Sequence, residues 1–333
     1  MKQASTGTVT KQRDGTGRIR RRKGGVETFL AVRWQLIAMA GGPGRLEETA
    51  IDALTRVHLT RLDKVLYPAA RVTKGDVLTY YIRVAPLLLP FLQDRPLTMH
   101  RFPDGFGGEG FFEKDAPAGT PEYVDIFTHF SKTAGRDVHF IVCDNLDTLI
   151  WIANLASLEI HIALSTAGSF ESPDFLLFDI DPEPPLRFDD VIDVAHIVRE
   201  QLEGAGLQPF VKTSGKKGVH IVVPLIPGYR FSEAREFAHR MGKEIARTAP
   251  HVVSEFPRSR DPGTIFIDYL QNAHGKTMVA PYSLRATPGA TVSAPLRWEE
   301  LRHGVRPEDF NIKTMLSRHE EPWRGILDAR QTI

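Results

Sequence analysis

Two aspartates at the end of an apolar segment are the residues of this sequence best suited to chemistry. Residues 175–182 read FLLFDIDP. Because alternate side chains of a strand point to the same face, Asp179 and Asp181 share one face of the predicted strand. The opposite face carries the apolar side chains of Leu176, Phe178 and Ile180.

Two neighbouring carboxylates repel each other, so their proximity requires a compensating charge. Two such anions about 4 Å apart repel by about 4 kcal/mol at an effective dielectric of about 20. A fold keeps the pair readily where a cation or a proton lies between the two groups. Pro182 ends the strand, which places the pair where a ligand can reach it. The spacing of Asp179 and Asp181 therefore predicts a divalent-metal site.

A basic, glycine-containing turn suited to phosphate occupies residues 212–220, KTSGKKGVH, before the strand 221–224. Its two glycines let the backbone approach an anion closely. It differs from the GxxxxGK[ST] phosphate loop in residue order and in leading to a strand. Such a turn alone is more often only a turn, but beside a carboxylate pair it favours phosphate binding. The side chains able to donate to phosphate oxygens are Ser214, Lys217 and His220.

A third acid, Asp268, ends the apolar strand predicted at residues 264–268. An acid in that position is common for trivial reasons. Three strand-ending acids with a phosphate-suited turn between them in sequence are typical of two-metal phosphoryl transfer.

Helices and strands alternate around these motifs, which predicts an α/β or α+β body with a mixed sheet. Thr73 or Asp76 is expected to cap a helix that follows residues 62–68, with Pro86 and Pro90 punctuating the next piece. A hairpin is predicted within residues 97–114, and strand, turn and strand within 210–224. Further helices are predicted at 148–163, 188–204 before Gly206, and 232–249.

Composition sets broad limits on the protein. The 333 residues are 42% hydrophobic and 25% charged, which is ordinary for a soluble globular protein, and a net charge of +1 selects no partner. Cys143 is the single cysteine and stands in an apolar run, so we expect a core thiol and a reducing, cytoplasmic environment. No stretch reads as a membrane span or signal peptide, so no membrane association is expected.

The amino-terminal segment is strongly basic. Residues 1–25 carry eight lysines and arginines against one acid, Asp14. We predict a basic, disordered extension over residues 1–45 and one catalytic domain over 46–333. Two interpretations of the extension remain open: a solvated leader, or an arm that adds non-specific affinity for phosphates.

The motifs, taken in order, resemble the polymerase module of bacterial ligase D, a member of the archaeo-eukaryotic primase superfamily. The resemblance covers about residues 58–302 and implies an α+β primase-polymerase fold, with mixed or antiparallel sheets flanked by helices. The matching segments are 62–68, 73–76, 110–114, 179–182, 214–220, 267–269 and 280–285.

The resemblance implies a template-directed nucleotidyltransferase that fills short gaps or extends DNA ends in non-homologous end joining. It implies two divalent cations, Mn²⁺ or Mg²⁺, and an NTP or dNTP substrate with a preference for ribonucleotides. Asp179 and Asp181 would bridge both ions, and Asp268 would serve mainly the ion at the primer terminus. Ser214, Lys217 and His220 would hold the triphosphate.

The same resemblance assigns further residues, each with an ordinary structural alternative. His161 matches a histidine near the nucleotide, and its alternative is a satisfied helix histidine. Gln271 and Arg285 match active-site positions, against ordinary surface or sheet-edge polar groups. Arg260 matches a family arginine only with shifted spacing. Lys64 and Lys74 match residues that hold a 5′-phosphate, and their alternative is a solvated helix face. Phe111 and Phe112 match residues that contact the template, and their alternative is a hairpin core.

Departures from the family pattern bear on primer or gap preference. His100 and Arg101 stand where the family often has Lys-Arg, and Ile162 and Ala163 replace a usual proline and tryptophan. With no KxDG motif and no ligase segment after residue 333, a stand-alone polymerase is expected. Its expected partners are gapped or broken DNA with a 5′-phosphate, the end-binding protein Ku and a separate DNA ligase.

Two other functions remain open. The first is a primer-making primase or a gap-filling enzyme of excision repair on the same scaffold. The second is a non-catalytic module that bridges DNA gaps or ends through Lys64, Lys74 and Phe111, against which the intact aspartates count.

Overall fold

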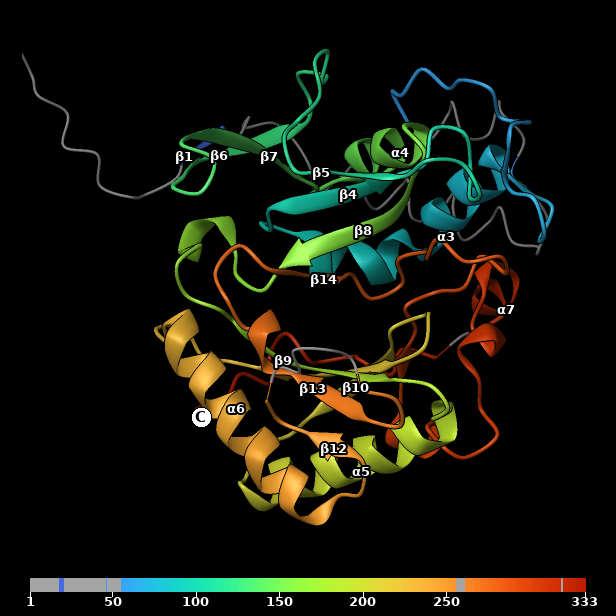
Figure 1. Ribbon diagram of the computed structural model, residues 1–333. Helices are drawn as coiled ribbons and strands as arrows, with labels where there is room; N and C mark the ends of the chain where they lie inside the picture. The colour runs from blue at the N-terminus through green and yellow to red at the C-terminus, as the bar shows by residue number, and fades with distance from the viewer. Residues whose placement is uncertain (1–17, 21–45, 47–54, 256–260, 319) are drawn as a thin grey trace, which may run out of the picture.

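The computed structural model describes residues 18–20, 46, 55–255, 261–318 and 320–333. Arg260 lies outside the described residues. So does most of the predicted extension, residues 1–45. Within it the structure describes β1 (Arg18–Arg20), which pairs antiparallel with β6 (Asp125–Ser131). Figure 1 shows two main layers of helix and strand, one above the other.

The lower layer in Figure 1 is built on a six-stranded sheet with the order β12-β13-β9-β11-β10-β15. The strand β9 (Phe175–Pro182) runs between β13 (Ile265–Asp268) and β11 (Val219–Pro224), antiparallel to both. The remaining strands are β12 (Val252–Val253), β10 (Phe210–Thr213) and β15 (Pro295–Leu296).

Two helices, α5 (Phe188–Gly204) and α6 (Phe231–Thr248), pack on one face of this sheet. Leu176, Phe178 and Ile180 are buried in the cluster that these helices share with the sheet. Burying each such side chain stabilises the fold by about 1.5–3 kcal/mol. The predicted alternation in β9 is therefore confirmed, and its aspartates point to the other face, toward the upper layer.

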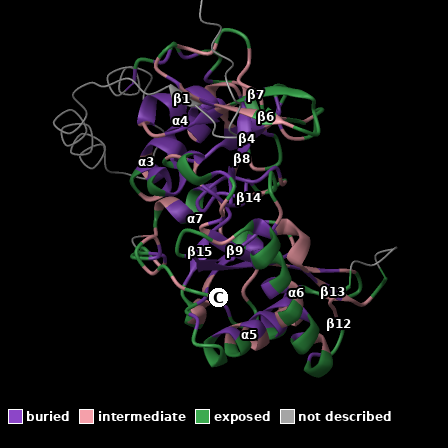
Figure 2. Ribbon diagram, turned by 90° about the vertical axis from the view of Figure 1, so that its left-hand side faces the viewer, coloured by how far each residue is buried: buried purple, intermediate pink, exposed green. Residues whose placement is uncertain are grey.

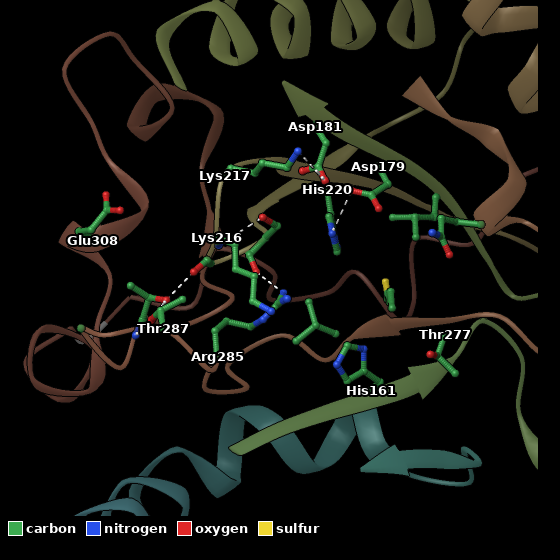
Figure 3. Close-up of a pocket in the computed structure, with 18 of the residues that line it drawn as sticks. His161, Asp179, Asp181, Lys216, Lys217, His220, Thr277, Arg285, Thr287 and Glu308 are labelled. Carbon is green, nitrogen blue, oxygen red and sulfur yellow. Dashed lines mark hydrogen bonds and ion pairs between the residues drawn. The ribbon is translucent and has the colours of Figure 1, made fainter. Parts of the chain in front are cut away.

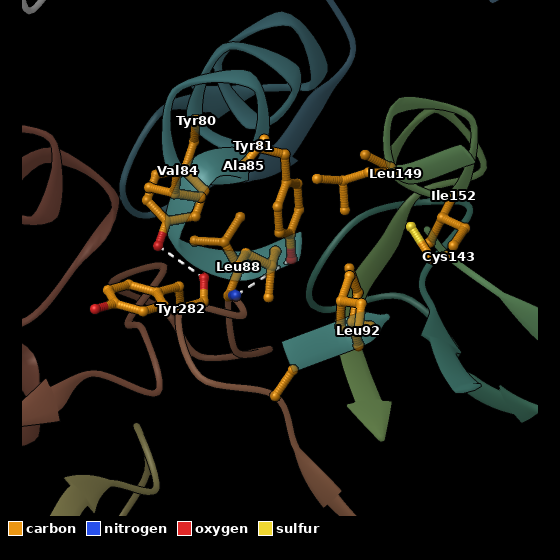
Figure 4. Close-up of a cluster of buried hydrophobic side chains, with 14 of the residues drawn as sticks. Tyr80, Tyr81, Val84, Ala85, Leu88, Leu92, Cys143, Leu149, Ile152 and Tyr282 are labelled. Carbon is orange, nitrogen blue, oxygen red and sulfur yellow. Dashed lines mark hydrogen bonds between the residues drawn. The ribbon is translucent and has the colours of Figure 1, made fainter. Parts of the chain in front are cut away.

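The upper layer is built on a four-stranded antiparallel sheet with the order β14-β8-β4-β5. Helices α3 (Lys74–Leu92) and α4 (Leu146–Asn154) pack against it around Tyr80, Tyr81 and Leu149 (Figure 4). Tyr81 donates to the Leu158 carbonyl oxygen at 3.3 Å. The four strands are β14 (Thr277–Val279), β8 (Ser157–Ala163), β4 (Leu97–Arg101) and β5 (Phe111–Glu113).

The helix predicted at residues 148–163 is wrong in its second half. Asn145 caps α4, the helix ends at Asn154, and the chain continues as the strand β8. The reversal occurs at Ala156, whose φ of 59° is unusual for a residue other than glycine, so no glycine or proline marks it in the sequence. His161 therefore lies on a strand and not on a helix.

The helix α3 also differs from expectation. Thr73 caps it as predicted and accepts from the Asp76 backbone N–H at 3.3 Å, but Pro86 and Pro90 lie inside the helix. By length and composition α3 is apolar enough to cross a membrane, contrary to the sequence expectation. Most of the helix is buried within the protein, as in the core helix of a globular domain. Its core packing outweighs the loss of about 3 kcal/mol that an interior proline typically brings.

Smaller elements complete the fold. The strand β7 (Arg136–Val142) extends the β1-β6 sheet, β2 (Val65–Tyr67) pairs with β3 (Val72–Thr73), and α7 (Ile312–Leu316) lies near the carboxyl end. In Figure 2 buried residues gather in α3, α4 and the central strands, while α5 and α6 expose an outer surface. Cys143 is buried, as predicted. The predicted α+β class is confirmed, with β12 and β13 parallel in an otherwise antiparallel sheet.

Candidate active site

A row of ionisable side chains crosses four strands of the six-stranded sheet on the face away from α5 and α6. In the ladder, Asp268 of β13 stands opposite Asp179 of β9, and His220 of β11 stands opposite Asp179 on the other side. Lys212 of β10 stands opposite His220 and completes the row. Asp181 shares the face of Asp179 two residues further on. Three carboxylates predicted from separate segments thus share one sheet face.

The aspartates repel one another. Burial raises the pKa of Asp268, and the charge of Asp179 raises it further. Asp268 accepts hydrogen bonds from the Leu270 backbone N–H at 2.9 Å and from Gln271 Nε2 at 3.1 Å. These bonds lower the pKa but offset only part of the rise. The raised pKa means that ionising Asp268 beside Asp179 costs free energy, which a bound cation would offset.

The aspartate trio is spread more widely than a single-ion site. Asp179, Asp181 and Asp268 are absent from the groups of described residues whose ligand atoms all lie within 4.8 Å of one another. The carboxylate oxygens of the trio are nevertheless donors of the kind that Mg²⁺ and Mn²⁺ take.

A buried lysine and histidine border Asp179. Lys212 Nζ lies 2.8 Å from His220 Nδ1 and 2.6 Å from Ser293 Oγ. Because the lysine is a donor, His220 Nδ1 accepts and the ring carries its proton on Nε2, which lies 3.2 Å from Asp179 Oδ1. Burial lowers the pKa of both Lys212 and His220. The pair thus orients Asp179. The sequence analysis missed this role of Lys212, which lies in the buried strand β10.

The basic glycine turn approaches the aspartates closely. Ser214 Oγ accepts from the Gly218 backbone N–H at 3.1 Å, and Gly215 has a φ of 75°. A Cβ on Gly218 would overlap Asp181 Oδ1 and the Ile180 carbonyl oxygen. Gly218 is therefore required by the approach of the turn to β9, and Gly215 by its positive φ and its close approach to Arg285 and Val292. The sequence predicted only an approach to an anion.

Lys217 of the turn faces the same strand end. Its Nζ lies 3.9 Å from Asp181 Oδ2, 3.2 Å from Glu183 Oε1 and 3.0 Å from the Pro182 carbonyl oxygen. The lysine thus contacts both carboxylates near the end of β9. It remains within reach of a phosphate group bound beside Asp181.

A glutamate on the facing sheet is the main functional residue that the sequence analysis missed. Glu159 of β8 is 1% exposed, and its Oε1 lies 2.9 Å from Lys216 Nζ and 3.2 Å from Arg285 Nε. Its Oε2 lies 2.9 Å from His161 Nε2 and 3.3 Å from His100 Nδ1.

These partners reverse the effect of burial on Glu159. Burial alone would raise its pKa, but hydrogen bonds from His100 and His161 and the charge of Arg285 hold that pKa far below its usual value. Glu159 is therefore ionised and saturated with donors. The alternation of Leu158, Glu159, Ile160 and His161 was the signal that would have found it, had a strand been predicted there.

A cavity of about 670 Å³ opens between the two sheets (Figure 3). That volume is in the usual range for small-molecule sites. Asp179 and Asp181 line it. Asp268 is not a lining residue, but it accepts a hydrogen bond from Gln271, which is one. All predicted nucleotide-binding residues line the cavity: His161, Ser214, Lys217, His220, Gln271 and Arg285.

The predicted 5′-phosphate residues form a basic cluster at the start of α3. Lys74 is buried and donates to Thr60 Oγ1 at 3.0 Å, while Lys64 Nζ lies 2.9 Å from Asp104 Oδ1. Burial lowers the pKa of Lys74 to about 8, and the charges of Lys64 and Arg61 contribute. Lys74 is therefore not part of a solvated helix face, and the mutual repulsion of the cluster fits an anion site.

The two phenylalanines of β5 are exposed and lie on opposite faces of the strand. Phe111 is 43% exposed and Phe112 is 61% exposed, so neither belongs to a hairpin core. Phe112 stacks on His100 at 4.0 Å between ring centroids and lies 5.6 Å from the His161 ring, on the cavity side. Phe111 instead lies under the Arg101 guanidinium at 5.4 Å. Only Phe112 therefore faces the predicted nucleotide site.

Comparisons with known proteins find similar sequences and a similar structure. Residues 73–323 match the family described as LigD, primase-polymerase domain. The chain is 33% identical over 265 residues to the bifunctional non-homologous end joining protein LigD of Bacillus subtilis, covering 79% of this chain and 42% of that protein. It is 35% identical over 259 residues to the multifunctional LigD of Mycolicibacterium smegmatis, covering 75% and 33%.

The chain thus spans between a third and two fifths of the length of these relatives. Among solved structures, it is similar to the polymerase domain from Mycobacterium tuberculosis ligase D in complex with DNA. The TM-score is 0.76 at 34% identity, and the match covers 83% of this chain and 99% of that chain.

Proposed function

This chain belongs to the LigD primase-polymerase domain family, nucleotidyltransferases that act on DNA, and we propose that it fills short gaps or extends broken ends during non-homologous end joining. The observation that carries the proposal is the strand register that sets Asp268 opposite Asp179, with Asp181 on the same face.

The aspartate trio would hold the cations. Asp179 and Asp181 would contact both, and Asp268 would serve the one nearer the primer terminus. Bound Mn²⁺ or Mg²⁺ would lower the pKa of the attacking 3′-hydroxyl and neutralise charge on the triphosphate. The carboxylate donor set and the raised pKa of Asp268 support this assignment.

The basic turn and Arg285 would hold the triphosphate against the opposite wall of the cavity. The cavity is lined by Ser214, Lys216, Lys217 and Arg285 (Figure 3). Lys216 and Arg285 also contact Glu159. Fixed donors of this kind stabilise developing phosphate charge without reorganising during the reaction. His220, oriented by Lys212, would keep Asp179 in position beside the triphosphate.

The upper wall would receive the base and sugar of either an NTP or a dNTP. His161 and Thr277 line this side of the cavity and offer polar groups to ribose hydroxyls, which supports ribonucleotide use. Comparing UTP with dTTP at equal concentrations tests this part, because equal rates would contradict a sugar preference.

The DNA would extend from the cavity across β5 to the start of α3. Phe112 would stack on a template base, a contact worth about 1–3 kcal/mol, and Lys64 and Lys74 would hold the 5′-phosphate of a gap. We further propose that Ku and a separate DNA ligase act with this protein. The names of its relatives as end-joining proteins support that placement.

Primer extension on a gapped duplex with Mn²⁺ tests the proposal. We expect Asp179→Ala to abolish extension while DNA binding persists, and Asp193→Ala, an exposed aspartate on α5, to leave it unchanged. DNA binding by the unaltered protein without any extension would favour the non-catalytic bridging module. Product made without a supplied primer would favour a primase.

A further inference from the structure

Two histidines and a glutamate from three distant segments converge outside the nucleotide cavity. His129 lies on β6, Glu171 follows the short helix η1 (Ala167–Ser169), and His274 lies between η2 (Tyr269–Gln271) and β14. One ligand atom of each residue lies within 4.8 Å of the other two. Glu171 Oε1 is 3.8 Å from His129 Nε2 and 3.3 Å from His274 Nε2. Both ring nitrogens thus face one carboxylate oxygen.

Aromatic side chains hold the two imidazoles in place. The ring of Phe170, which is buried, lies 4.8 Å from the His129 ring and 4.9 Å from the His274 ring, edge-on to both. Phe231 contacts the His274 ring at 5.5 Å, and Phe127 stacks near His129 at 6.0 Å. The ligand atoms are therefore positioned by packing, which reduces the entropy that binding must overcome.

The donor set identifies the class of ion. Two imidazole nitrogens and one carboxylate oxygen match Zn²⁺ sites that keep a fourth position for water. Tetrahedral Zn²⁺ with bonds of about 2.1 Å needs ligand atoms about 3.4 Å apart, so the observed spacings of 3.3 and 3.8 Å require only small shifts.

The other cluster of this composition differs in its surroundings. His100, Glu159 and His161 also bring their ligand atoms within 4.8 Å of one another. Glu159 there already faces Lys216 and Arg285, so a cation would have to displace two positive charges. Only the Glu171 cluster combines suitable donors with an exposed carboxylate that an ion can reach.

We propose that His129, Glu171 and His274 form a second metal site that takes a borderline divalent cation such as Zn²⁺. The ion would fix the segment between β13 and β14 to β6. That segment carries Gln271 at its start and is followed by Thr277, both of which line the nucleotide cavity. The role of this site is structural: it holds the two segments together and takes no part in nucleotide transfer.

Zn²⁺ titration of the metal-stripped full chain by calorimetry, with excess Mg²⁺ to occupy the aspartates, tests this site. We expect one Zn²⁺ per chain, at least tenfold weaker binding in His274→Gln and Glu171→Gln, and unchanged binding in the control His303→Gln. His303 is an exposed histidine that also faces a carboxylate, on Asp193. His274 and Glu171 are themselves accessible, so their variants should fold.

A second measurement gives the coordination directly. Co²⁺ bound in place of Zn²⁺ should show the intense visible absorption of a tetrahedral site, and Zn²⁺ should displace it. Added Zn²⁺ should raise the melting temperature of the unaltered protein and of His303→Gln, but not of His274→Gln. No stoichiometric Zn²⁺ binding, or equal affinity in the His274→Gln protein, would overturn the site while leaving the polymerase proposal unaffected.

Discussion

Two carboxylates on facing sheets, the buried Glu159 and the partly buried Asp268, have pKa values that move in opposite directions. The four-stranded sheet surrounds Glu159 with two histidines, a lysine and an arginine, and its pKa falls far below the usual value. The six-stranded sheet sets Asp268 opposite Asp179, and its pKa rises. Burial opposes ionisation at both sites, so the partners decide the direction.

The comparison separates two uses of a buried acid. Glu159 is saturated by the protein's own cations and positions Lys216 and Arg285 at the cavity. Asp268 instead stands opposite a second carboxylate, Asp179, so bound cations would stabilise its ionised form. A saturated acid should matter to stability even without metal, whereas an unsaturated one should matter to catalysis and to metal binding.

The largest expected effect comes from removing charge at the unsaturated site. Asp268→Asn should lower the rate of nucleotide addition at least a thousandfold, because one ligand of the cations is lost. It should leave the melting temperature without metal unchanged or higher, since repulsion with Asp179 is relieved. Primer extension and thermal unfolding in EDTA measure both. A large drop in melting temperature would break the comparison by making Asp268 a structural acid.

The opposite pattern is expected at the saturated site. Glu159→Gln should destabilise the protein by about 3–5 kcal/mol, because it leaves the buried Arg285 without its carboxylate. It should also raise the KM for the nucleotide, since Lys216 and Arg285 lose their anchor. Urea unfolding without metal checks the first effect, with the exposed Glu200→Gln as a neutral control. Equal stability of the two variants would contradict the role of Glu159.

The backbone of the glycine turn also supports the aspartate site, because Gly218 packs against β9. Gly218→Ala should cost about 1–3 kcal/mol of stability and reduce kcat, because the new Cβ overlaps Asp181 and the Ile180 carbonyl. Gly204→Ala, at the end of α5 with open space around it, should be neutral or slightly stabilising. Unfolding curves and single-turnover rates for the two variants provide the measurement. A neutral Gly218→Ala would mean that the turn is not held against β9.

The smallest effect concerns Lys74, a buried cation. Its charged form is destabilised by neighbouring charges, whereas that of Glu159 is stabilised by them. Lys74 has a pKa lowered to about 8, so it is charged below that pH and neutral above it. Preference for 5′-phosphorylated over unphosphorylated gaps should therefore fall a few-fold as pH rises from 7 to 9, with a midpoint shifted upward by the bound phosphate. Fluorescence anisotropy with the two gapped duplexes measures this preference.

Two variants test the assignment to Lys74. Lys74→Arg stays charged and should remove the pH dependence, whereas Lys74→Ala should remove the phosphate preference itself. The lowered pKa also means that the unfolded chain binds more protons between about pH 8 and 10.5, so the contribution of this group to stability rises with pH there. An unchanged pH profile in the arginine variant would show that another group is responsible.

Local sequence pattern predicted the elements that carry the aspartates. Alternation in residues 175–182 predicted β9 and the common face of Asp179 and Asp181, and the ends of α5 and β13 agree within a residue. The register that sets Asp268 opposite Asp179 could not be derived in this way, because the pairing of distant strands depends on tertiary packing. The sequence pattern suggested Asp268 as a third acid and the family resemblance assigned it to the site, but neither gave its position opposite Asp179.

The saturated acid was missed for a local reason. The chain reverses at Ala156 without a glycine or proline, so the apolar pattern seemed to continue as one helix through residue 163. On a helix, Glu159 and His161 would diverge, and the partners of the glutamate could not be foreseen. Lys212 was missed because its role depends on His220 across the ladder.

Counting bound Mn²⁺ tests the central claim most directly. With a non-hydrolysable nucleotide present, titration followed by electron paramagnetic resonance should find two Mn²⁺ per unaltered chain. The Asp268→Asn protein should lose one of these ions or bind it at least tenfold more weakly, while Asp193→Asn should keep both. Two ions bound with unchanged affinity by Asp268→Asn would contradict the assignment of the aspartate trio.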